Sequence, residues 1–416
     1  MDAVVIAIGD ELLLGKTVNN NAAFLSRRLA ALGVPTRRQL VVGDARDDIV
    51  AAVREGRELA TLIVATGGLG PTDDDRTLAA VAGYLGLELV LHAPTLKHIE
   101  QLFERRRIPM PPLNVGQARV PAGARVLRNP LGTAPGLVVE GDGFVLCLLP
   151  GVPAEMEYLF ENGLAPYLEE KGYLGERVFE WQIRTVGLPE SAVAEKVGKL
   201  PVPGGVRLAY LPHHAQVDLR MWGAAPDEAA FRERAGPLAK GIHKALGADV
   251  FAEGDATLEE VVGRLLTRRG ATLAVAESCT GGLIAKRLTD VAGASAWFRG
   301  GVVSYANDAK VDLLGVEAAT LAAFGAVSEE TTREMAAGAR CRLGADYALA
   351  ATGVAGPTGG TDAKPVGTVC LALAAEDGVA SETAFFTGDR EWIRWRAATR
   401  ALDLLRRRLL AKGGKG

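Results

Sequence analysis

Short apolar runs alternate with amphipathic helical patterns over the first 170 residues of the chain. Ala3–Ile8 is a continuous apolar run, and Asn21–Leu32 carries apolar residues at helical spacing. Strands that alternate with helices in this way indicate a parallel sheet with crossover helices. The same pattern predicts strands at Leu40–Val42, Leu62–Ala65 and Phe144–Leu149, and helices at Asp47–Leu59, Arg76–Leu85 and 153–170.

The pattern changes after residue 170 and later returns. Strand-like runs at Arg177–Val186, Val206–Leu211 and Gln216–Trp222 precede a helical pattern at Asp227–Leu246, which predicts a small α+β unit. From Leu258 the strand–helix alternation restarts, with strands at Ala271–Ala276, Gly301–Tyr305, Tyr347–Thr352, Val366–Ala374 and Ala380–Phe386 and helices at Leu258–Arg268, Gly282–Leu288, Ser328–Cys341 and Arg390–Leu410. We therefore predict an α/β protein in which two βα-rich three-layer domains, 1–170 and 254–416, flank a small α+β domain, 171–253.

Composition narrows the class of protein. The 416 residues are 48% hydrophobic with a net charge of −3, which excludes disorder and nucleic-acid binding by bulk charge. The four cysteines are far apart, which argues against a disulfide framework or a structural zinc site. The first apolar run is too short for a signal peptide, and none approaches 18 residues. We expect a cytoplasmic protein that binds neither membranes nor nucleic acid.

Two glycine loops share one pattern. Residues 65–72 read ATGGLGPT and residues 351–358 read ATGVAGPT, and each loop follows an apolar strand. At the carboxyl end of a parallel strand, such a loop offers several backbone N–H groups to an anion. Each loop alone is as well explained as an ordinary glycine turn. Their repetition favours two phosphate- or nucleotide-binding sites.

Acidic residues follow two of the predicted strands of the first domain. Asp10 and Glu11 come after the first strand, and Asp73, Asp74 and Asp75 come after the glycine loop. Because the carboxyl ends of parallel strands meet at one edge, these five carboxylates are candidate ligands for Mg²⁺ or a similar hard cation. The alternative is that they cap helices and occupy first turns, where the helix dipole favours negative charge.

A serine at a strand-to-helix turn is the candidate nucleophile of the third domain. Ser278 follows the strand Ala271–Ala276, and no histidine occurs after His243, so this domain has no Ser-His-Asp triad. Lys310 is the candidate base, since a helix N-terminus and burial both disfavour its charged form. The alternatives are a simple N-cap for Ser278, a solvated surface lysine for Lys310, and Cys279 as the nucleophile.

The N-terminal motifs resemble a known family. The stretches 9–21 (GDELLLGKTVNNN), 66–77 (TGGLGPTDDDRT), 129–136 (NPLGTAPG) and 150–156 (PGVPAEM) are similar to the first domain of CinA-type competence/damage-inducible proteins, which looks like the molybdopterin-binding fold. Leu69 departs from the Thr of many pterin-binding loops. The resemblance implies metal-dependent cleavage of ADP-ribose to AMP and ribose 5-phosphate, with a divalent cation of the Mg²⁺ or Co²⁺ class and K⁺ as a further candidate. It implies a nucleotide site of Gly67, Gly68, Gly70, Thr72, Asn129, Gly132 and Thr133.

The C-terminal motifs resemble the last CinA domain. They are 277–282 (ESCTGG), Ser304–Asn307 followed by Lys310, 326–328, 351–360 and 365–369. The resemblance implies cofactor-free hydrolysis of nicotinamide mononucleotide to nicotinate mononucleotide and ammonia, a step of NAD salvage, with Ser278 as nucleophile, Lys310 as base and Tyr305 orienting Lys310 or relaying the proton. It implies an oxyanion and substrate site of Glu277, Cys279, Thr280, Gly281, Asn307, Thr352, Gly353, Ala355, Gly356, Arg390 and Arg396. For the arginines, together with Arg394, a solvated helix face is the alternative.

The middle domain resembles the KH type in this family. A KH domain clamps RNA with an exposed GxxG loop between helices, whereas Gly204 and Gly205 precede a predicted strand. His213 and His214 form an isolated pair that fits a turn better than a metal site. We therefore expect a spacer or dimerisation module and a homodimer. Two rival functions are a molybdopterin-binding or adenylylating module and a non-catalytic competence accessory.

Overall fold

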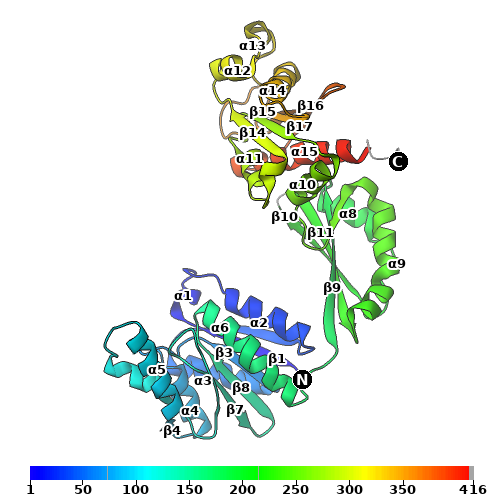
Figure 1. The fold of residues 1–416 in the computed structure, drawn as a ribbon. Helices are drawn as coiled ribbons and strands as arrows, with labels where there is room; N and C mark the ends of the chain where they lie inside the picture. The colour runs from blue at the N-terminus through cyan, green and yellow to red at the C-terminus, as the bar shows by residue number, and fades with distance from the viewer. Residues whose placement is uncertain (73, 214, 412–416) are drawn as a thin grey trace. The chain divides into compact units, whose positions relative to one another are not determined.

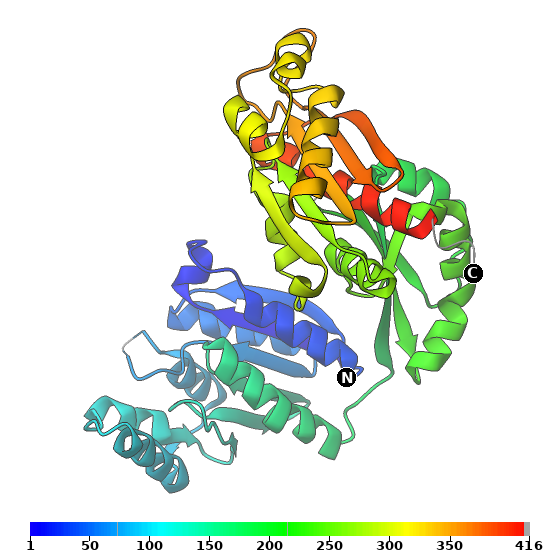
Figure 2. The ribbon, with the colours of Figure 1, turned by 45° about the horizontal axis from the view of Figure 1, so that its top comes forward.

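The computed structural model describes residues 1–72, 74–213 and 215–411 (Figures 1 and 2). The chain divides into two compact units, one of residues 1–179 with 223–231 and one of residues 180–222 with 232–416. The α/β fold class predicted from the hydrophobic pattern is confirmed. No helix in the described part of the chain is both long and apolar enough to cross a membrane.

The first unit is built on a six-stranded sheet in the order β2-β1-β3-β8-β7-β6. β2, β1, β3 and β8 are parallel, and β7 and β6 are antiparallel to their neighbours. The strands are β1 (Ala3–Ile8), β2 (Thr36–Val42), β3 (Leu62–Thr66), β6 (Arg125–Leu127), β7 (Gly136–Gly141) and β8 (Phe144–Leu149), and the pair β4 (Leu89–Leu91) and β5 (Arg119–Pro121) forms a separate small sheet.

Helices cover both faces of this sheet, because β1, β3 and β8 are apolar on both sides (Figure 1). One buried cluster packs α2, α6 and α7 against the sheet, and a second packs α3 and α4 against the other face. The helices are α1 (Asp10–Leu13), α2 (Asn20–Ala31), α3 (Arg46–Leu59), α4 (Thr77–Leu85), α5 (Ala93–Arg105), α6 (Pro153–Leu159) and α7 (Ala165–Glu170), with a 3₁₀ segment at Pro112–Ala118 and a π turn at Phe160–Leu164 between α6 and α7.

The small central sheet has the order β10-β11-β9-β12. The predicted loop position of Gly204 and Gly205, directly before β10, is confirmed. The short strand β12 and the helix α8 were not predicted. The elements are β9 (Arg177–Val186), β10 (Arg207–His213), β11 (Gln216–Ala225), β12 (Val250–Glu253), α8 (Glu190–Val197) and α9 (Glu228–Leu246).

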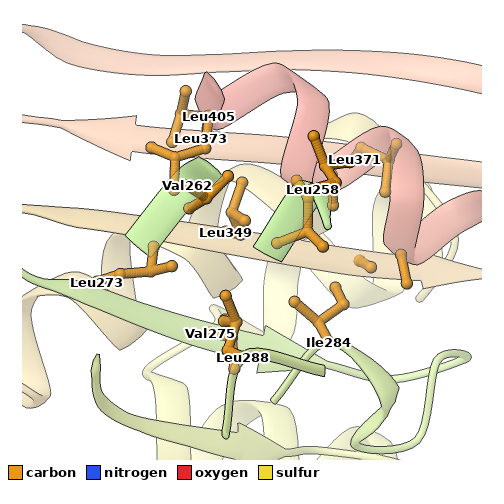
Figure 3. Close-up of a cluster of buried hydrophobic side chains, with 14 of the residues drawn as sticks. Leu258, Val262, Leu273, Val275, Ile284, Leu288, Leu349, Leu371, Leu373 and Leu405 are labelled. Carbon is orange, nitrogen blue, oxygen red and sulfur yellow. The ribbon is translucent and has the colours of Figure 1, made fainter. Parts of the chain in front are cut away.

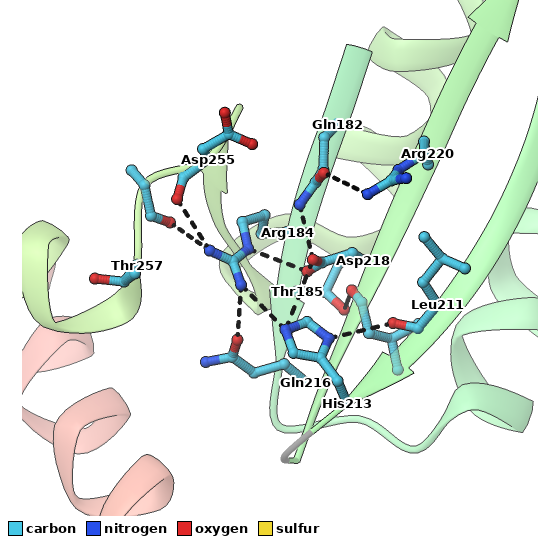
Figure 4. A network of polar contacts seen from close by, with 12 residues as sticks. Gln182, Arg184, Thr185, Leu211, His213, Gln216, Asp218, Arg220, Asp255 and Thr257 are labelled. Atoms are coloured by element: carbon cyan, nitrogen blue, oxygen red, sulfur yellow. Dashed lines mark hydrogen bonds and ion pairs between the residues drawn. The ribbon is translucent and has the colours of Figure 1, made fainter. Parts of the chain in front are cut away.

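Arg184 of β9 joins this sheet to the segment that leads into the last domain (Figure 4). Its guanidinium donates to the Asp218 carboxylate at 3.1 Å and to the main-chain carbonyls of Asp255 at 3.2 Å and Ala256 at 3.1 Å. It also lies 3.1 Å from Nε2 of His213, so that histidine belongs to this network. His214, the other residue of the pair, lies outside the described residues.

The C-terminal sheet has the order β14-β13-β15-β16-β17, with the first three strands parallel and the last two antiparallel. A capping box of Thr257 and Glu260 starts α10. The elements are β13 (Leu273–Glu277), β14 (Phe298–Val303), β15 (Tyr347–Gly353), β16 (Thr368–Ala375), β17 (Gly378–Phe385), α10 (Leu258–Arg269), α11 (Leu283–Thr289), α12 (Asn307–Leu314), α13 (Ala318–Phe324), α14 (Glu329–Arg342) and α15 (Arg390–Ala411).

Two cores stabilise this sheet from its two faces. On one face, side chains of α10, α11 and α15 pack against the central strands, with Leu258, Val262 and Leu405 fully buried (Figure 3). On the other face, α12 and α14 pack against small residues of β13 and β15. The helix α15 therefore runs along the sheet as a fixed element (Figure 2).

Several predicted boundaries are wrong for identifiable reasons. β14 ends at Val303 and not at Tyr305, so Ser304 and Tyr305 lie beyond the strand. β2 begins at Thr36, four residues before its predicted start, because it is an edge strand whose charged residues hide the apolar pattern. The helix α5 was not predicted.

Candidate active sites

Three strand ends bring the predicted residues of the last domain together. β13 lies between β14 and β15. The connection from β13 to β14 contains α11 and the connection from β14 to β15 contains α12 and α14, and these two connections pack on opposite faces of the sheet. This is the topological switch point, where α/β sheets bind ligands. Ser278 follows β13, Ser304 follows β14 and Gly353 ends β15, so all three lie at the same edge.

Ser278 and Lys310 form a hydrogen-bonded pair. Lys310 Nζ lies 3.2 Å from Ser278 Oγ, 2.8 Å from the Ser304 carbonyl oxygen and 3.4 Å from the Tyr305 carbonyl oxygen. Lys310 has no exposed surface, and burial lowers the pKa of its ammonium group below the ordinary value. A carbonyl oxygen only accepts, so a neutral amine that donates to both carbonyls presents its lone pair to the serine hydroxyl.

Glu277 fixes the turn that carries Ser278 by hydrogen bonds to the start of α11. This buried carboxylate accepts hydrogen bonds from the N–H groups of Ile284 at 3.0 Å and Ala285 at 2.8 Å, at the start of α11. The implied substrate role of Glu277 is therefore wrong, because both of its oxygens are used to fix the turn. The Gly281 N–H donates to the Ser278 carbonyl oxygen at 3.0 Å. It is therefore not available to an oxyanion, in contrast to the oxyanion site that the resemblance implies.

Cys279 lies next to Ser278 but is buried in the core. Its burial raises the pKa of the thiol to about 12, so it is a neutral thiol at physiological pH and a poor nucleophile. We expect iodoacetamide at pH 8 to label the exposed Cys341 of the native protein and to leave Cys279 unmodified, as measured by peptide mass spectrometry. In guanidinium chloride all four cysteines should react. Labelling of Cys279 as fast as Cys341 would contradict this assignment.

Arginines of α15 reach the same edge. Arg390 donates to the Tyr305 hydroxyl at 2.8 Å and to the Gly356 carbonyl oxygen at 2.6 Å, and Arg394 donates to the Thr280 carbonyl oxygen at 2.7 Å. The Tyr305 ring is 63% exposed. Tyr305 contacts Lys310 only through its main-chain carbonyl, so the implied relay of a proton through its hydroxyl is not formed in this structure.

The remaining predicted residues of this site have different positions. Thr352 is buried, and its hydroxyl donates to the Ala326 carbonyl oxygen at 2.9 Å. This hydrogen bond joins the start of the glycine loop to the segment before α14. Arg396 donates to Thr387 and lies over the Trp392 ring, and its implied role in substrate binding stays a prediction. Asn307 is exposed at the start of α12, and Ala355 is buried within the glycine loop.

The glycine loop of the first unit follows β3 at the edge where β1 also ends. Gly67 has a φ of +112°, and a Cβ atom there would lie 2.1 Å from the Ile8 carbonyl oxygen, so only glycine fits. Gly68 has a φ of +65°, and Thr77 closes the loop by donating to the Gly67 carbonyl oxygen at 2.9 Å. The loop therefore packs its backbone directly against the end of β1.

A cavity of about 490 Å³ is lined by this loop and by several carboxylates, and we call it the acidic cavity. Asp10 and Asp44 exchange hydrogen bonds through their main-chain N–H groups. Burial raises the pKa of Asp44, and the nearby carboxylates of Asp10, Glu11 and Asp74 raise it further. The carboxylates that line the cavity are Glu11, Asp44, Asp74, Asp75 and Glu155.

One of the predicted metal ligands, Asp75, already has a structural contact. The Asp75 carboxylate accepts from the N–H and the hydroxyl of Thr72, at 2.9 and 2.6 Å, so it braces the loop. Asp73 lies outside the described residues. Among the residues that are described, no group of three or more metal-binding side chains is preformed. The mutual repulsion at Asp44 nevertheless fits a cation held among Glu11, Asp44 and Asp74.

The loop 129–134 forms the far wall of the acidic cavity. Asn129 is buried, and its side chain donates to the Ala134 carbonyl oxygen at 2.8 Å and to Glu155 at 2.6 Å, while it accepts from the N–H of Gly132 at 3.1 Å. Asn129 thus shapes the wall. Gly70 and Thr133 line the cavity, and a Cβ atom at Gly132 would meet the Glu155 carboxylate. Sequence reasoning missed Asp44 and Glu155. Asp44 comes soon after β2, a parallel strand of the same sheet, so the rule that the carboxyl ends of parallel strands meet at one edge could have found it.

The comparisons with known proteins agree with this architecture. Residues 4–170 match a probable molybdopterin binding domain, residues 181–252 the damage-inducible protein CinA KH domain, and residues 255–409 the CinA C-terminal domain. A putative competence-damage inducible protein of Moorella thermoacetica is 45% identical over 412 residues, which cover 99% of this chain and 100% of the relative. A relative of the same description from Symbiobacterium thermophilum is 46% identical over 422 residues, covering 99% of both chains.

A solved structure that is similar in sequence covers a smaller part of this chain. The crystal structure of the competence/damage inducible protein CihA from Agrobacterium tumefaciens is 46% identical, covers 36% of this chain and 94% of its own, and has a TM-score of 0.35. The full-length relatives carry the assignment, since their identity extends over nearly every residue of both chains. The chain belongs to the CinA family.

Proposed function

We propose that the C-terminal domain hydrolyses nicotinamide mononucleotide to nicotinate mononucleotide and ammonia. The observation that supports this most strongly is the distance of 3.2 Å between Ser278 Oγ and Lys310 Nζ at a strand-to-helix turn. A buried lysine with a lowered pKa is suited to act as a general base, and a serine next to such a base is an activated nucleophile.

The reaction follows from this pair. Lys310 Nζ takes the proton of Ser278 Oγ while the oxygen attacks the carboxamide carbon, and the carbonyl oxygen becomes an oxyanion. The main-chain N–H groups of Cys279 and Thr280, in the same turn, would donate to it. Lys310 then gives its proton to the departing nitrogen, so that ammonia leaves and an acyl ester remains on Ser278. Water, deprotonated by Lys310, hydrolyses the ester and restores both residues.

Analysis of the products tests this proposal. Full-length protein incubated with nicotinamide mononucleotide should release ammonia and nicotinate mononucleotide in equal amounts, as measured by a coupled ammonia assay and by NMR. Release of free nicotinamide would mean that the glycosidic bond breaks instead of the amide bond. That result, or no reaction at all, would contradict the proposal.

The same proposal assigns metal-dependent hydrolysis of ADP-ribose to the first unit. The supporting observation is the acidic cavity beside a glycine loop, a combination that suits a diphosphate and a divalent cation. Glu11, Asp44 and Asp74 would hold the cation, which when bound would polarise a phosphoryl oxygen. The Gly67–Gly70 loop would orient the diphosphate, and the wall at Asn129 would limit access of bulk water.

Asp74→Asn is expected to lower AMP formation from ADP-ribose by at least about tenfold, because the cation loses one anionic ligand. Chelation of divalent metal should abolish AMP formation by the wild-type protein. Asp47→Asn, in the first turn of α3 and outside the cavity lining, should leave the rate unchanged. Metal-independent AMP formation, or equal rates for the two variants, would contradict this site.

The expected homodimer, cytoplasmic location, spacer role of the KH-type domain and use of K⁺ remain predictions.

A further inference from the structure

A second cavity of about 400 Å³ lies in the first unit on the other side of the loop 129–134. We call it the basic cavity. Its lining includes His92, Lys97 and His98 from the start and middle of α5, and Arg128 from the strand end before the loop. Among the residues that the structure describes, no carboxylate lines it. Its electrostatic character is therefore opposite to that of the acidic cavity.

The positive charges of this cavity are not neutralised by the protein. Lys97 and Arg128 are both exposed, and neither has an ion-pair partner in the part of the chain that the structure describes. The first turn of α5 also faces the cavity with Pro94 and Thr95, and its N-cap His92 makes no capping hydrogen bond. Two free cations in a concave site beside an uncapped helix start attract a multiply charged anion.

One ring nitrogen of His98 has no hydrogen-bond partner among the described residues. Its Nε2 lies 2.7 Å from the Asn129 carbonyl oxygen and must donate to it, since a carbonyl only accepts. Its Nδ1 is buried and has no hydrogen-bond partner among the described residues. The imidazole is thus held in place on the cavity wall with one nitrogen unused, and buried polar groups without partners are uncommon.

The two cavities share one wall and are coupled through it. The side chain of Asn129 donates to Glu155 of the acidic cavity, and its carbonyl oxygen accepts from His98 of the basic cavity. Thr133 lines both cavities. A phosphorylated product released in the acidic cavity therefore has the basic cavity next to it, on the other side of Thr133.

We propose that the basic cavity binds a phosphomonoester. Arg128 matches the geometry of phosphate oxygens, and Lys97 supplies a second point charge. In one arrangement the phosphomonoester is ribose 5-phosphate produced in the acidic cavity, which rests on the activity proposed above. In the other it is a separate phosphorylated ligand that binds whether or not ADP-ribose is hydrolysed. Both arrangements require the same two cations.

Binding of ribose 5-phosphate and of inorganic phosphate to the full-length protein, measured by isothermal titration calorimetry, tests this proposal. The variant Lys97→Gln/Arg128→Gln should bind both ligands at least about tenfold more weakly than the wild type. The matched control Arg105→Gln/Arg106→Gln removes two positive charges from the exposed end of the same helix, outside the cavity lining, and should bind as the wild type does. Thermal unfolding followed by circular dichroism verifies that both variants are folded.

Kinetics of ADP-ribose cleavage distinguish the two sources. Competitive inhibition by ribose 5-phosphate that disappears in Lys97→Gln/Arg128→Gln identifies the product, and binding that persists under saturating ADP-ribose identifies a separate ligand. Absence of binding to the wild type, or equal binding by the cavity variant and the control, would overturn the proposal. Binding without any cleavage of ADP-ribose would contradict the proposed hydrolysis and leave the phosphomonoester site intact.

Discussion

Lys310→Met is expected to lower kcat for ammonia release from nicotinamide mononucleotide by at least about 10³-fold, since general-base catalysis contributes about 10²–10⁴ and also activates the nucleophile here. Methionine fills a similar volume in a site that is fully buried, so the fold should be retained. The substrate should still bind, because Arg390 and the glycine loop after β15 lie on other elements than Lys310. We therefore expect the loss in kcat and little change in KM. A loss that appears only in KM would contradict the role of Lys310 as a base.

The pH profile separates a base from a merely structural lysine. Burial lowers the pKa of Lys310, and only the neutral amine can take the serine proton, so kcat/KM should rise with pH and level off above that lowered pKa. Lys310→Arg keeps a cation that does not deprotonate and should be as inactive as Lys310→Met at every pH. An active Lys310→Arg variant would show that the charge, and not proton transfer, is what the site needs.

Asp403→Ala should lower the free energy of unfolding by about 3–5 kcal/mol, because it leaves a buried arginine without its counter-ion. Asp403 and Arg406 are both essentially without exposed surface on α15. The Asp403 carboxylate accepts from Arg406 at 2.6 and 2.8 Å and from Arg407 at 2.7 Å. Arg406 also donates to the Ala248 carbonyl oxygen at 2.6 Å, which joins α15 to the segment before β12. Urea unfolding followed by circular dichroism measures the change.

The exposed ion pair of Asp377 and Arg408 provides the control for this prediction. Both side chains are at least a third exposed to solvent, so Asp377→Ala should cost less than about 1 kcal/mol. Similar losses for Asp403→Ala and Asp377→Ala would mean that burial does not decide the energy of the cluster on α15.

The proximity of Ser278 and Lys310 could be predicted from sequence because both residues follow parallel strands of one sheet. Ser278 and Lys310 follow neighbouring parallel strands, and the carboxyl ends of such strands meet at one edge. The same rule places the glycine loop of the first unit beside the acids that follow β1. The absence of histidine beyond His243 then left Lys310 as the leading base.

Hydrogen bonds between distant segments could not be predicted in the same way. The orientation of Tyr305 depends on Arg390, which lies 85 residues away, and the function of Glu277 depends on how α11 begins. The basic cavity was missed because α5 was not predicted, so Lys97 and His98 had no element to place them. Pairs of this kind are set by tertiary packing, and no period or local motif in the chain encodes them.

Ammonia release from nicotinamide mononucleotide by Ser278→Ala and Cys279→Ala, compared side by side with the wild type, tests whether Ser278 is the nucleophile. Ser278 makes the contact with Lys310, whereas the Cys279 thiol is buried and has a raised pKa. We expect Ser278→Ala to lose activity by at least about 10³-fold and Cys279→Ala to keep at least half of it. An active Ser278→Ala variant together with an inactive Cys279→Ala variant would contradict it.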